Sequence, residues 1–576
     1  MPIAESPTAA VPPVPAYEVL AADIQRLGVT AVFGLMSDDT ALFVTTLDAM
    51  GLRFYGARHE NQAVAMAEGY AAATGRLGIA IIGRGPATAN GLHGAVYASR
   101  TGSRVLLIFG YVSTGAGAAI GLGPNGLGPD GKAFNAPVVL EASGIKTFVA
   151  AESATARRSL ALAVASTQAG GCAALLLPMN VQFGLIAPGP ANAPAALAPT
   201  TAPRLRARQV AVDAAAALLD RSRKPLFVVG LGAHQAGARS AIEQLADRVG
   251  AVVATSLKAK DMFRGWPYNL GMIGSFSHSA GRRLIDEADC IVVFGAGLNQ
   301  RTTSYGTAVP PGVPLIQVDT TRSHIGRWCH ADLALVANAR DAAEQLLAAV
   351  AAKPAADKPF HTEAVRLRLA DFDIAGDFEP AHTPRTIDPR SVALALDKLL
   401  PADRNTVFDS GNFLQVLPYV SGQGPDHFKS AHDFSSIGLG FGTALGFAVG
   451  SPQRCTVLFI GDGAFLMTMG ELETVVREDI PLVIVLMNDC AYGAELHYLK
   501  MRNMPVSKSV FPDIDYAPIA AGFGFQAATV RTLAELQALA PMLRQPEGPI
   551  FLDCKINASV MAPFLLETVE HERRKA

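Results

Sequence analysis

Short runs of apolar residues alternate along the chain with longer segments in which apolar positions recur at helical spacing. The runs occupy residues 31–33, 79–82, 105–109, 226–229, 252–253, 291–294, 315–318, 407–408, 456–460, 482–487 and 550–552. Runs of this length suit strands that are buried on both faces of a sheet, and the helical segments between them return the chain to the same edge. The pattern predicts an α/β protein built from parallel sheets.

Two stretches interrupt this alternation. Residues 187–203 are so rich in proline and alanine that they cannot hold a regular helix, and residues 351–360 begin a second, more polar connection. We therefore expect three parallel-sheet domains, at residues 17–186, 204–350 and 390–562. The first 16 residues lack a basic region followed by an apolar core, so we expect a flexible lead and not a signal peptide.

Composition narrows the functional classes. A chain of 576 residues is too long for one hydrophobic core, and 50% hydrophobic with 17% charged residues indicates a globular protein. The net charge of −2 argues against nucleic acid as a partner. The six cysteines form no CxxC pair and suit reduced thiols, and no charge-free apolar run reaches transmembrane length. We expect a cytoplasmic protein that does not bind a membrane.

One local pattern points to chemistry. The apolar run 456–460 ends at Gly461-Asp462-Gly463, and after a helical segment (464–478) the run 482–487 ends at Asn488-Asp489. Asp462 and Asp489 are therefore predicted at the carboxyl ends of neighbouring parallel strands, where open α/β sheets bind ligands. Carboxylate and carbonyl oxygens are ligands that Mg²⁺ prefers, with phosphates completing its shell. The competing interpretation is an ordinary strand-to-helix turn with Asp462 as a helix cap, which an isolated GDG would favour.

Residues 461–489 resemble the thiamine diphosphate motif, in which GDG is followed by a helix, a strand and a pair of asparagines. Nearly the whole chain after residue 16 is similar to the group of acetohydroxyacid synthase, pyruvate decarboxylase and benzoylformate decarboxylase. In that group a pyrimidine-binding domain comes first, a central Rossmann-like domain second and a diphosphate-binding domain last. The resemblance implies thiamine diphosphate and Mg²⁺ as cofactors.

The resemblance also implies the residues that hold these cofactors. The metal ligands would be Asp462, Asp489 and the backbone carbonyl of Ala491, although relatives usually carry Asn where this chain has Asp489. Asn488 is the alternative ligand if the register is shifted by one residue. The further cofactor-binding positions would be Ser410, Gly411, Asn412, Gly461, Gly463 and Ala464, with Ile437 as the apolar residue beneath the cofactor.

Glu60 is the predicted catalytic carboxyl group. It stands in Arg58-His59-Glu60 at the start of a helical segment, where the family carries the glutamate that contacts the aminopyrimidine ring nitrogen. On its own, such a residue could equally be a helix N-terminal carboxylate that interacts with the helix dipole.

Two further carboxylates, Asp38 and Glu495, align with the substrate-pocket acids of pyruvate decarboxylases, where they would relay protons. The alternative is that both face solvent. The adjacent histidine pair of those decarboxylases is absent at residues 110–113, and the tryptophan of acetohydroxyacid synthases corresponds to Tyr498, preceded by His497. The substrate is therefore not identified by these positions, and pocket volume would depend on residues 115–131 and on the charged segment after Ala562, either a lid or a solvated tail.

The resulting hypothesis is an enzyme that cleaves or forms a C–C bond next to a carbonyl, most simply by decarboxylating a 2-oxo acid with accompanying carboligase activity. An acetolactate synthase-type carboligase and a non-catalytic cofactor-binding homologue are the alternatives. FAD is the less favoured cofactor, because Gly230-Leu231-Gly232 is not followed by the third glycine of a dinucleotide loop. The resemblance implies a homodimer in which Glu60 and the diphosphate site come from different subunits, or a homotetramer.

Overall fold

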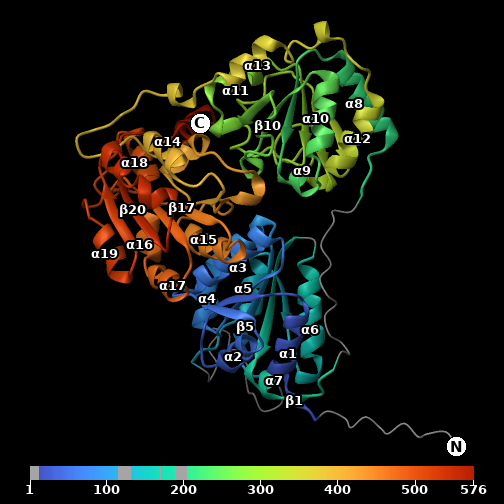
Figure 1. Ribbon diagram of the computed structural model, residues 1–576. Coiled ribbons are helices and arrows are strands. Elements are labelled where there is room, and N and C mark those ends of the chain that lie inside the picture. Colours follow the sequence, from blue (N-terminus) through green and yellow to red (C-terminus); the bar gives the residue numbers. More distant parts are fainter. Residues whose placement is uncertain (1–11, 115–130, 169, 190–203, 576) are drawn as a thin grey trace, which may run out of the picture. The chain divides into compact units, whose positions relative to one another are not determined.

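The computed structural model describes residues 12–114, 131–168, 170–189 and 204–575 (Figure 1). Three six-stranded sheets dominate it, and their strands pair in parallel. A small antiparallel pair joins β1 (Val14–Pro15) to β8 (Leu185–Ile186). The expected parallel α/β architecture is therefore confirmed. Most of the predicted lead, of the proline-rich linker and of the stretch 115–131 lies outside the described residues.

The first sheet has the order β3-β2-β4-β5-β7-β6. Its strands are β2 (Ala31–Leu35), β3 (Arg53–Gly56), β4 (Gly78–Ile82), β5 (Arg104–Tyr111), β6 (Lys146–Val149) and β7 (Gly171–Pro178). Its helices are α1 (Ala16–Arg26), α2 (Ala41–Ala49), α3 (Glu60–Thr74), α4 (Pro86–Thr101), α5 (Ala136–Ala142), α6 (Ser153–Ser166) and α7 (Met179–Phe183). Every residue of β4 is buried, as expected for a central strand covered on both faces.

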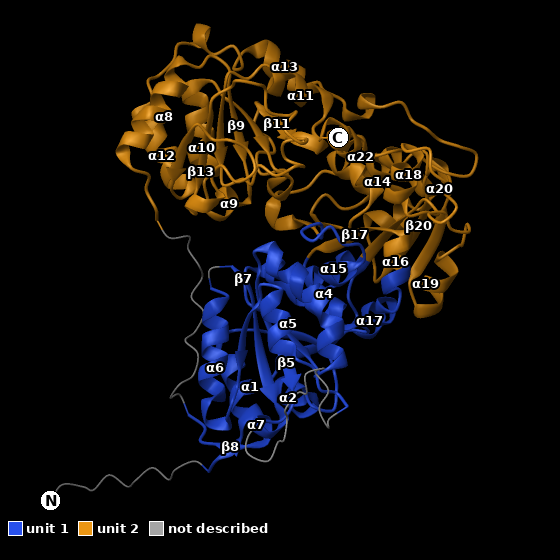
Figure 2. Ribbon diagram, turned by 180° about the vertical axis from the view of Figure 1, so that it is seen from behind, with its two compact units in different colours: residues 1–199, 431–453, 466–482 blue, residues 200–430, 454–465, 483–576 orange. Residues whose placement is uncertain are grey.

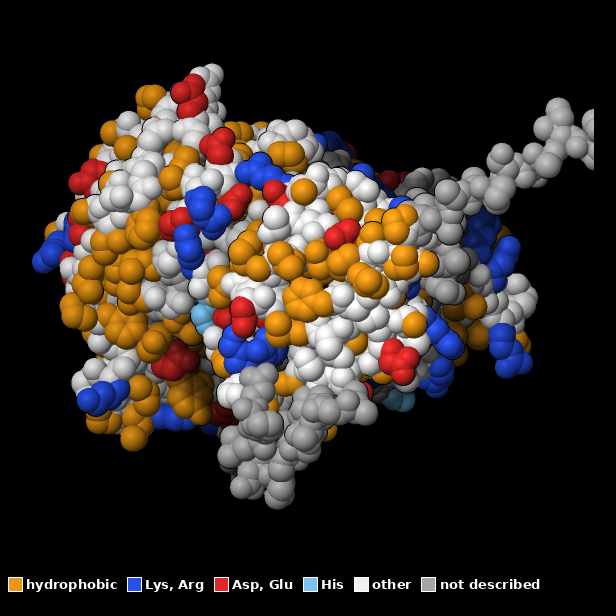
Figure 3. All heavy atoms as spheres, turned by 90° about the horizontal axis from the view of Figure 1, so that it is seen from below, with side chains coloured by type: hydrophobic (Ala, Val, Ile, Leu, Met, Phe, Trp, Pro, Cys, Tyr) orange, Lys and Arg blue, Asp and Glu red, His pale blue; other side chains and the backbone are white. Residues whose placement is uncertain are grey.

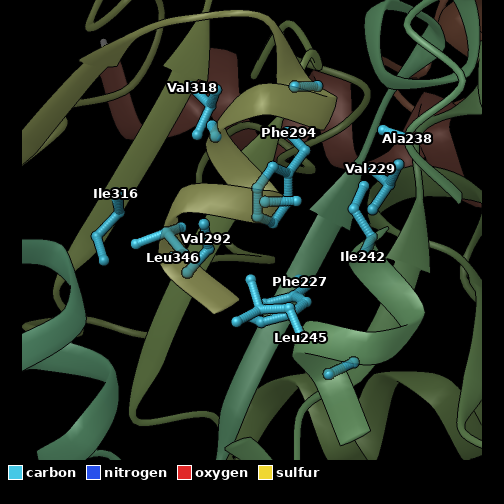
Figure 4. Close-up of a cluster of buried hydrophobic side chains, with 14 of the residues drawn as sticks. Phe227, Val229, Ala238, Ile242, Leu245, Val292, Phe294, Ile316, Val318 and Leu346 are labelled. Carbon is cyan, nitrogen blue, oxygen red and sulfur yellow. The ribbon is translucent and has the colours of Figure 1, made fainter. Parts of the chain in front are cut away.

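The second sheet has the order β11-β10-β9-β12-β13-β14, which is the 3-2-1-4-5-6 order of dinucleotide-binding folds. Its strands are β9 (Pro225–Val229), β10 (Val252–Thr255), β11 (Asn269–Met272), β12 (Cys290–Phe294), β13 (Leu315–Asp319) and β14 (Leu333–Val336). Its helices are α8 (Gln209–Arg221), α9 (Leu231–Gln235), α10 (Arg239–Val249), α11 (Ser279–Asp286), α12 (Ala339–Ala349) and α13 (Glu363–Ala370). Figure 4 shows Phe227 and Phe294 from the strands packing with Leu245 and Leu346 from the helices.

The third sheet has the order β16-β15-β17-β18-β20-β19. Its strands are β15 (Arg404–Phe408), β16 (Phe428–Ser430), β17 (Cys455–Gly461), β18 (Leu482–Asn488), β19 (Gln526–Val530) and β20 (Ile550–Lys555). Its helices are α14 (Pro389–Leu399), α15 (Leu439–Gly450), α16 (Asp462–Thr468), α17 (Glu471–Arg477), α18 (Gly493–Lys500), α19 (Ala517–Phe523), α20 (Leu533–Ala538), α21 (Ala540–Arg544) and α22 (Pro563–Lys575). Numbered within each sheet, the first and third sheets have the same 2-1-3-4-6-5 order.

Each predicted apolar run lies within a strand. The strands that the pattern did not predict are mostly at sheet edges, such as β6 (KTFV) and β19 (QAATV), where partly exposed and polar positions break the apolar run. The single helix expected at residues 464–478 is wrong. The structure has α16 and α17 there, separated by Met469-Gly470.

The chain divides into two compact units (Figure 2). Unit 1 comprises residues 1–199, 431–453 and 466–482, and unit 2 comprises residues 200–430, 454–465 and 483–576. The three sheets fall within the three predicted domain ranges, but the compact units follow contacts instead of chain order. The domain boundaries themselves stay a prediction.

Within unit 1, α15 lies along α3 with their backbones almost touching. A Cβ atom built at Gly446 would lie 1.8 Å from the Met66 carbonyl oxygen, and one at Gly69 would lie 2.0 Å from the Thr443 carbonyl oxygen. Glycine at these positions is what permits the helices to approach so closely. Gln62 joins them further, because its Nε2 donates to the Gly438 carbonyl (3.0 Å) and its Oε1 accepts the Gly442 N–H (2.8 Å).

Charged side chains of both signs lie on the face of the molecule shown in Figure 3. On the face shown in Figure 3, acidic and basic side chains are interspersed among hydrophobic ones, in keeping with the net charge of −2. Among the described helices, none has the length and apolar character needed to cross a bilayer.

Candidate functional site

Asp462 lies where β17 meets α16 in unit 2. It is the first residue of α16, and only 2% of it is exposed. The neighbouring Gly463 has no room for a side chain, because a Cβ atom there would lie 2.7 Å from the Tyr492 ring. Tyr492 is itself held edge-on against Phe511, with ring centroids 4.6 Å apart. The GDG turn is thus packed against the loop that follows β18, as the predicted strand order requires.

Asp489 follows the end of β18 and faces Asp462. Its Oδ1 accepts the Ala491 N–H (3.2 Å), and Cys490 between them has a left-handed backbone with φ of 55°. A Cβ atom at Gly493 would lie 2.3 Å from Asp489 Oδ2, so glycine at this position makes room for the carboxyl group. The side chains of Asp462 and Asp489 share a hydrogen bond.

Burial raises the pKa of both carboxyl groups. The pKa of Asp462 rises to about 6. The pKa of Asp489 rises well above its ordinary value, first through burial and then through the negative charge of Asp462. Two acids in these surroundings resist ionising together, so the pair holds one shared proton in the hydrogen bond between the two carboxyl groups. A divalent cation in place of that proton would relieve the repulsion.

The donor set fits such a cation. Ala491 pairs with Val510 in an antiparallel bridge whose hydrogen bonds run from Tyr492 N–H to the Ser509 carbonyl and from Phe511 N–H to the Cys490 carbonyl, so the bridge does not use the Ala491 carbonyl. Over the described ranges, no three His, Cys, Asp or Glu side chains gather as a metal-binding group. The protein would therefore supply two carboxylates and a carbonyl, and phosphate or water oxygens would complete the shell of Mg²⁺.

Asn488, the alternative ligand, has its side chain engaged elsewhere. Its Nδ2 donates to Asp553 (2.8 Å), and its Oδ1 accepts the Cys490 N–H (3.1 Å). Both ends of the amide are thus hydrogen-bonded within the strand-end structure. Of the two neighbours, Asp489 is the one whose side chain faces Asp462.

The loop after β15 holds Ser410, Gly411 and Asn412, which are predicted to bind the cofactor. Asn412 is 5% exposed, and its amide is committed to the C-terminal segment: Nδ2 donates to the Val560 carbonyl (2.9 Å) and Oδ1 accepts the Ala562 N–H (2.9 Å). Gly411 has a φ of 152°, a conformation that favours glycine. Any contact of Asn412 with a cofactor would therefore use its backbone.

Glu60 and Ile437 belong to unit 1. Glu60 is the first residue of α3 and is 7% exposed, and Asn90 Nδ2 donates to its Oε2 (3.2 Å). The hydrogen bond from Gln62 to Gly438 brings the residue before Gly438, which is Ile437, to the first turn of α3. Ile437 is only partly buried, which suits a residue with a face available to a ligand.

The two predicted pocket carboxylates are both exposed. Asp38, in unit 1, pairs with Lys132 Nζ (2.6 Å), and the hydrogen bond from Lys132 lowers the pKa of that carboxyl. Glu495 lies in the first turn of α18 in unit 2. Because they belong to different units, their joint action stays a prediction.

Asp39 is the buried neighbour that the sequence did not single out. It is 3% exposed and accepts the Arg84 N–H (3.0 Å). A Cβ atom at Gly110 would lie 1.7 Å from Asp39 Oδ2. The glycine near the end of β5 is therefore the sequence feature that could have indicated a buried carboxyl group beside it.

His497 and the C-terminal segment complete the surroundings of α18. His497 is 4% exposed, burial lowers its pKa, and its Nε2 has no hydrogen-bond partner in the described part of the chain. Tyr498 is exposed, with the Arg502 guanidinium 3.6 Å from its ring centroid. The charged tail is not free: it forms α22, in which His571 stacks on Tyr305 at 4.5 Å.

Comparison with known families gives three matches in chain order. Residues 15–120 match the thiamine pyrophosphate enzyme N-terminal TPP-binding domain, and residues 212–346 match the central domain of the same enzymes. Residues 409–554 match their C-terminal TPP-binding domain. Together the matches cover more than half of the chain, and the last contains the whole Asp462–Asp489 site.

Curated relatives align along most of the chain. A probable acetolactate synthase large subunit from Methanocaldococcus jannaschii is 26% identical, over 95% of this chain and 93% of the relative. A sulfoacetaldehyde acetyltransferase from Castellaniella defragrans is 27% identical over 88% and 87%. A probable 2-ketoarginine decarboxylase AruI from Pseudomonas aeruginosa is 27% identical over 82% and 81%. These names cover a synthase, an acetyltransferase and a decarboxylase.

Proposed function

The chain belongs to the thiamine pyrophosphate enzyme family, and from this premise we propose that it uses thiamine diphosphate and Mg²⁺ to cleave or form a C–C bond next to a carbonyl. The observation that carries the metal part of the proposal is the hydrogen-bonded pair Asp462 and Asp489, whose pKa values are both raised by burial. When bound, thiamine diphosphate supplies the carbon nucleophile and the electron sink for such a reaction.

The chain's own residues take distinct roles in this proposal. Asp462, Asp489 and the Ala491 carbonyl hold the metal. The diphosphate would be bound by the backbone of the GDG turn and of the loop after β15. The residues are Gly461, Gly463, Ala464, Ser410, Gly411 and Asn412. Glu60 would exchange a proton with the pyrimidine ring nitrogen of the bound cofactor, and Ile437 would pack against the cofactor. Because Glu60 accepts a hydrogen bond from Asn90, its carboxyl group has a defined orientation at the start of α3.

For the reaction itself we propose decarboxylation of a 2-oxo acid, with carboligation to a ketone or aldehyde acceptor. Asp38 and Glu495 would move protons at the substrate. The second candidate is an acetolactate synthase-type carboligase, favoured by a relative of that name that aligns with 95% of the chain. A non-catalytic cofactor-binding homologue is the third, favoured by the acidic Asp489 where the family motif has Asn.

One screen separates these candidates. The protein, loaded with thiamine diphosphate and Mg²⁺, is incubated with aliphatic and aromatic 2-oxo acids while CO₂ release and ligated products are measured. Release of free aldehyde supports the decarboxylase, and acetolactate from pyruvate supports the synthase. Thermal stabilisation by the cofactors without turnover of any 2-oxo acid would support the non-catalytic homologue.

We also propose that the protein acts in the cytoplasm as a homodimer or homotetramer. Complementation tests the shared site. Glu60→Gln and Asp462→Ala variants, each inactive alone, are mixed under conditions that exchange subunits. Activity regained in the mixture means that Glu60 and Asp462 of different chains act on one cofactor, whereas a mixture that stays inactive means that each chain supplies both.

A further inference from the structure

Helix α17 and Glu478, the residue that follows it, form hydrogen bonds with β3 and with the connection between β3 and α3 in unit 1. The Arg477 guanidinium donates to the Gly56 carbonyl, and Arg53 donates to the Glu478 carbonyl (2.9 Å). The Arg58 side chain pairs with Glu473 (2.5 Å). These contacts hold the segment directly before Glu60 against a helix that lies more than 400 positions later in the chain.

Glu471 makes a different kind of contact, because it binds backbone instead of side chain. Its Oε1 accepts both the Arg58 N–H (2.9 Å) and the His59 N–H (3.1 Å), and its Oε2 accepts the Thr474 hydroxyl (2.8 Å). Hydrogen bonds from N–H groups to a carboxylate are shorter and stronger than those between neutral groups. Glu471 therefore fixes two consecutive peptide units.

The fixed peptides are those that set the position of Glu60. His59 is the N-cap of α3, and its ring accepts the Asn61 N–H (3.1 Å). Glu60 follows at the first helical position, so its Cα is displaced whenever the His59 peptide is displaced. On its other side the Glu60 carboxyl is held by Asn90. Glu471 thus fixes the backbone that precedes Glu60, and Asn90 fixes the orientation of the Glu60 side chain.

Glu471 is also an unusual residue to find in this place. It is 1% exposed, and in the described part of the chain no Arg or Lys forms an ion pair with it. Burying a carboxylate without a cation is costly unless hydrogen bonds compensate. Its neighbour Glu473 has a partly exposed side chain and does have such partners, in Arg58 and Arg477. The buried member of the pair is the one bound to the backbone before Glu60.

We propose that Glu471 is a positioning residue for Glu60, holding the Arg58–His59 backbone so that the Glu60 carboxyl meets the pyrimidine ring nitrogen. This inference rests on the proposed function in one respect, which is that Glu60 acts on thiamine diphosphate. Since a misplacement of about 1 Å can cost about 100-fold in rate, the loss of Glu471 is expected to reduce proton transfer by Glu60 much more than cofactor binding.

The test compares Glu471→Ala, Glu471→Gln and the matched control Glu473→Ala, which removes the Arg58 side-chain pair from the same helix. In protein without cofactor, amide hydrogen exchange at Arg58 and His59 is expected to speed up in E471A and to remain slow in E473A. With cofactor bound, exchange of the thiamine C2 proton is expected to fall at least about tenfold in E471A while cofactor affinity changes less than about threefold. In E471Q the side-chain amide oxygen can still accept hydrogen bonds from the two N–H groups. This variant is therefore expected to retain slow amide exchange at Arg58 and His59 and most of the C2 proton exchange.

Wild-type amide exchange and wild-type C2 proton exchange in E471A would overturn the proposal. If E471A does not fold, Glu471→Asp decides instead: its shorter side chain withdraws the oxygen from the two amides, so unchanged C2 proton exchange contradicts the positioning role. The variant Glu60→Gln separates a failure of the proposed function from a failure of the positioning role of Glu471. Normal C2 proton exchange in E60Q means that the proposed function fails, whereas slow exchange in E60Q with normal exchange in E471A means that only the role of Glu471 fails.

Discussion

Asp462 and Asp489 share a hydrogen bond between their carboxyl groups at the carboxyl ends of β17 and β18. Burial raises the pKa of each, and the charge of Asp462 raises that of Asp489 further. An acid pair of this kind is stable in two forms, either with a shared proton or with a cation. In the function that we propose, the form with the cation is the active one.

Metal binding should therefore depend on pH in a direction fixed by these pKa values. Because burial raises the pKa of Asp462 to about 6 and raises that of Asp489 well above its ordinary value, a cation must displace a proton near neutral pH. The affinity for Mg²⁺ in the presence of thiamine diphosphate is expected to rise about tenfold per pH unit as the pair loses its proton. Calorimetric titration from pH 5.5 to 8.5 measures this slope.

Asp489→Asn provides the matched comparison. The amide keeps an oxygen ligand but cannot hold the shared proton, so the slope above pH 6 is expected to flatten in this variant. If the Mg²⁺ affinity of the wild type and of the variant depended equally on pH, the pair Asp462 and Asp489 would not hold a shared proton near neutral pH.

A second pH effect concerns stability and Glu471. Burial raises its pKa from 4.5 to about 7. A carboxyl group that binds its proton more tightly in the folded protein stabilises the fold below pH 4.5, and this contribution is lost as pH rises through 7. The free energy of unfolding of the wild type, relative to Glu471→Gln, is expected to fall by about 3 kcal/mol between pH 4.5 and 7.5.

Denaturant titrations of both proteins across this range provide the measurement. Glu473→Gln is the control, since the hydrogen bond from Arg58 lowers the pKa of Glu473 and gives its contribution the opposite direction. A constant difference between the wild type and E471Q would show that Glu471 ionises as an exposed glutamate does.

The contact between α3 and α15 should tolerate no added methyl group. Gly446→Ala would place a Cβ atom 1.8 Å from the Met66 carbonyl oxygen, so the helices must separate and the fold is expected to lose about 3 kcal/mol or more. Gly522→Ala on α19 meets no atom within 4 Å and serves as the control, with an expected change of about 0.5 to 1 kcal/mol towards greater stability. Thermal unfolding of the two variants compares them; similar melting temperatures would contradict the tight packing.

Asn412 is expected to act as an anchor of the C-terminal segment. Asn412→Ala removes hydrogen bonds to the Val560 carbonyl, which keeps Gln415 Nε2 as a donor (3.1 Å), and to the Ala562 N–H, which loses its partner, at a cost of about 1–3 kcal/mol. Limited proteolysis should then cut near residue 560 faster than in the wild type. Unchanged proteolysis there would show that other contacts, such as those of α22, hold the segment alone.

Much of the fold was predictable because buried parallel strands have a strong signature. The run 456–460 is continuously apolar, and so the strand and the position of Asp462 at its end followed directly. Edge strands such as β19 carry polar and half-exposed positions, and therefore had no such signature. The helix break at Gly470 was missed because helical spacing of apolar residues continues across it.

The site was predictable only where local sequence determines it. Asp38 and Asp39 are adjacent acids, and only the tertiary contact with Arg84 shows that Asp39 is the buried one. The role of the Asn412 amide and the contact of Glu471 with the backbone before Glu60 each depend on residues more than 100 positions away. Such pairings arise from the packing of the sheets and helices, and no periodicity of the sequence encodes them.

Calorimetric titration of thiamine diphosphate into the wild type and into Asp462→Ala, each with Mg²⁺ and with a chelator, shows whether Asp462 holds a metal ion against the cofactor. This role of Asp462 predicts saturable binding of one cofactor per chain to the wild type with Mg²⁺, and loss of at least about 100-fold in affinity with the chelator or in D462A. Binding to D462A with wild-type affinity, or no binding to the wild type with Mg²⁺, would contradict it.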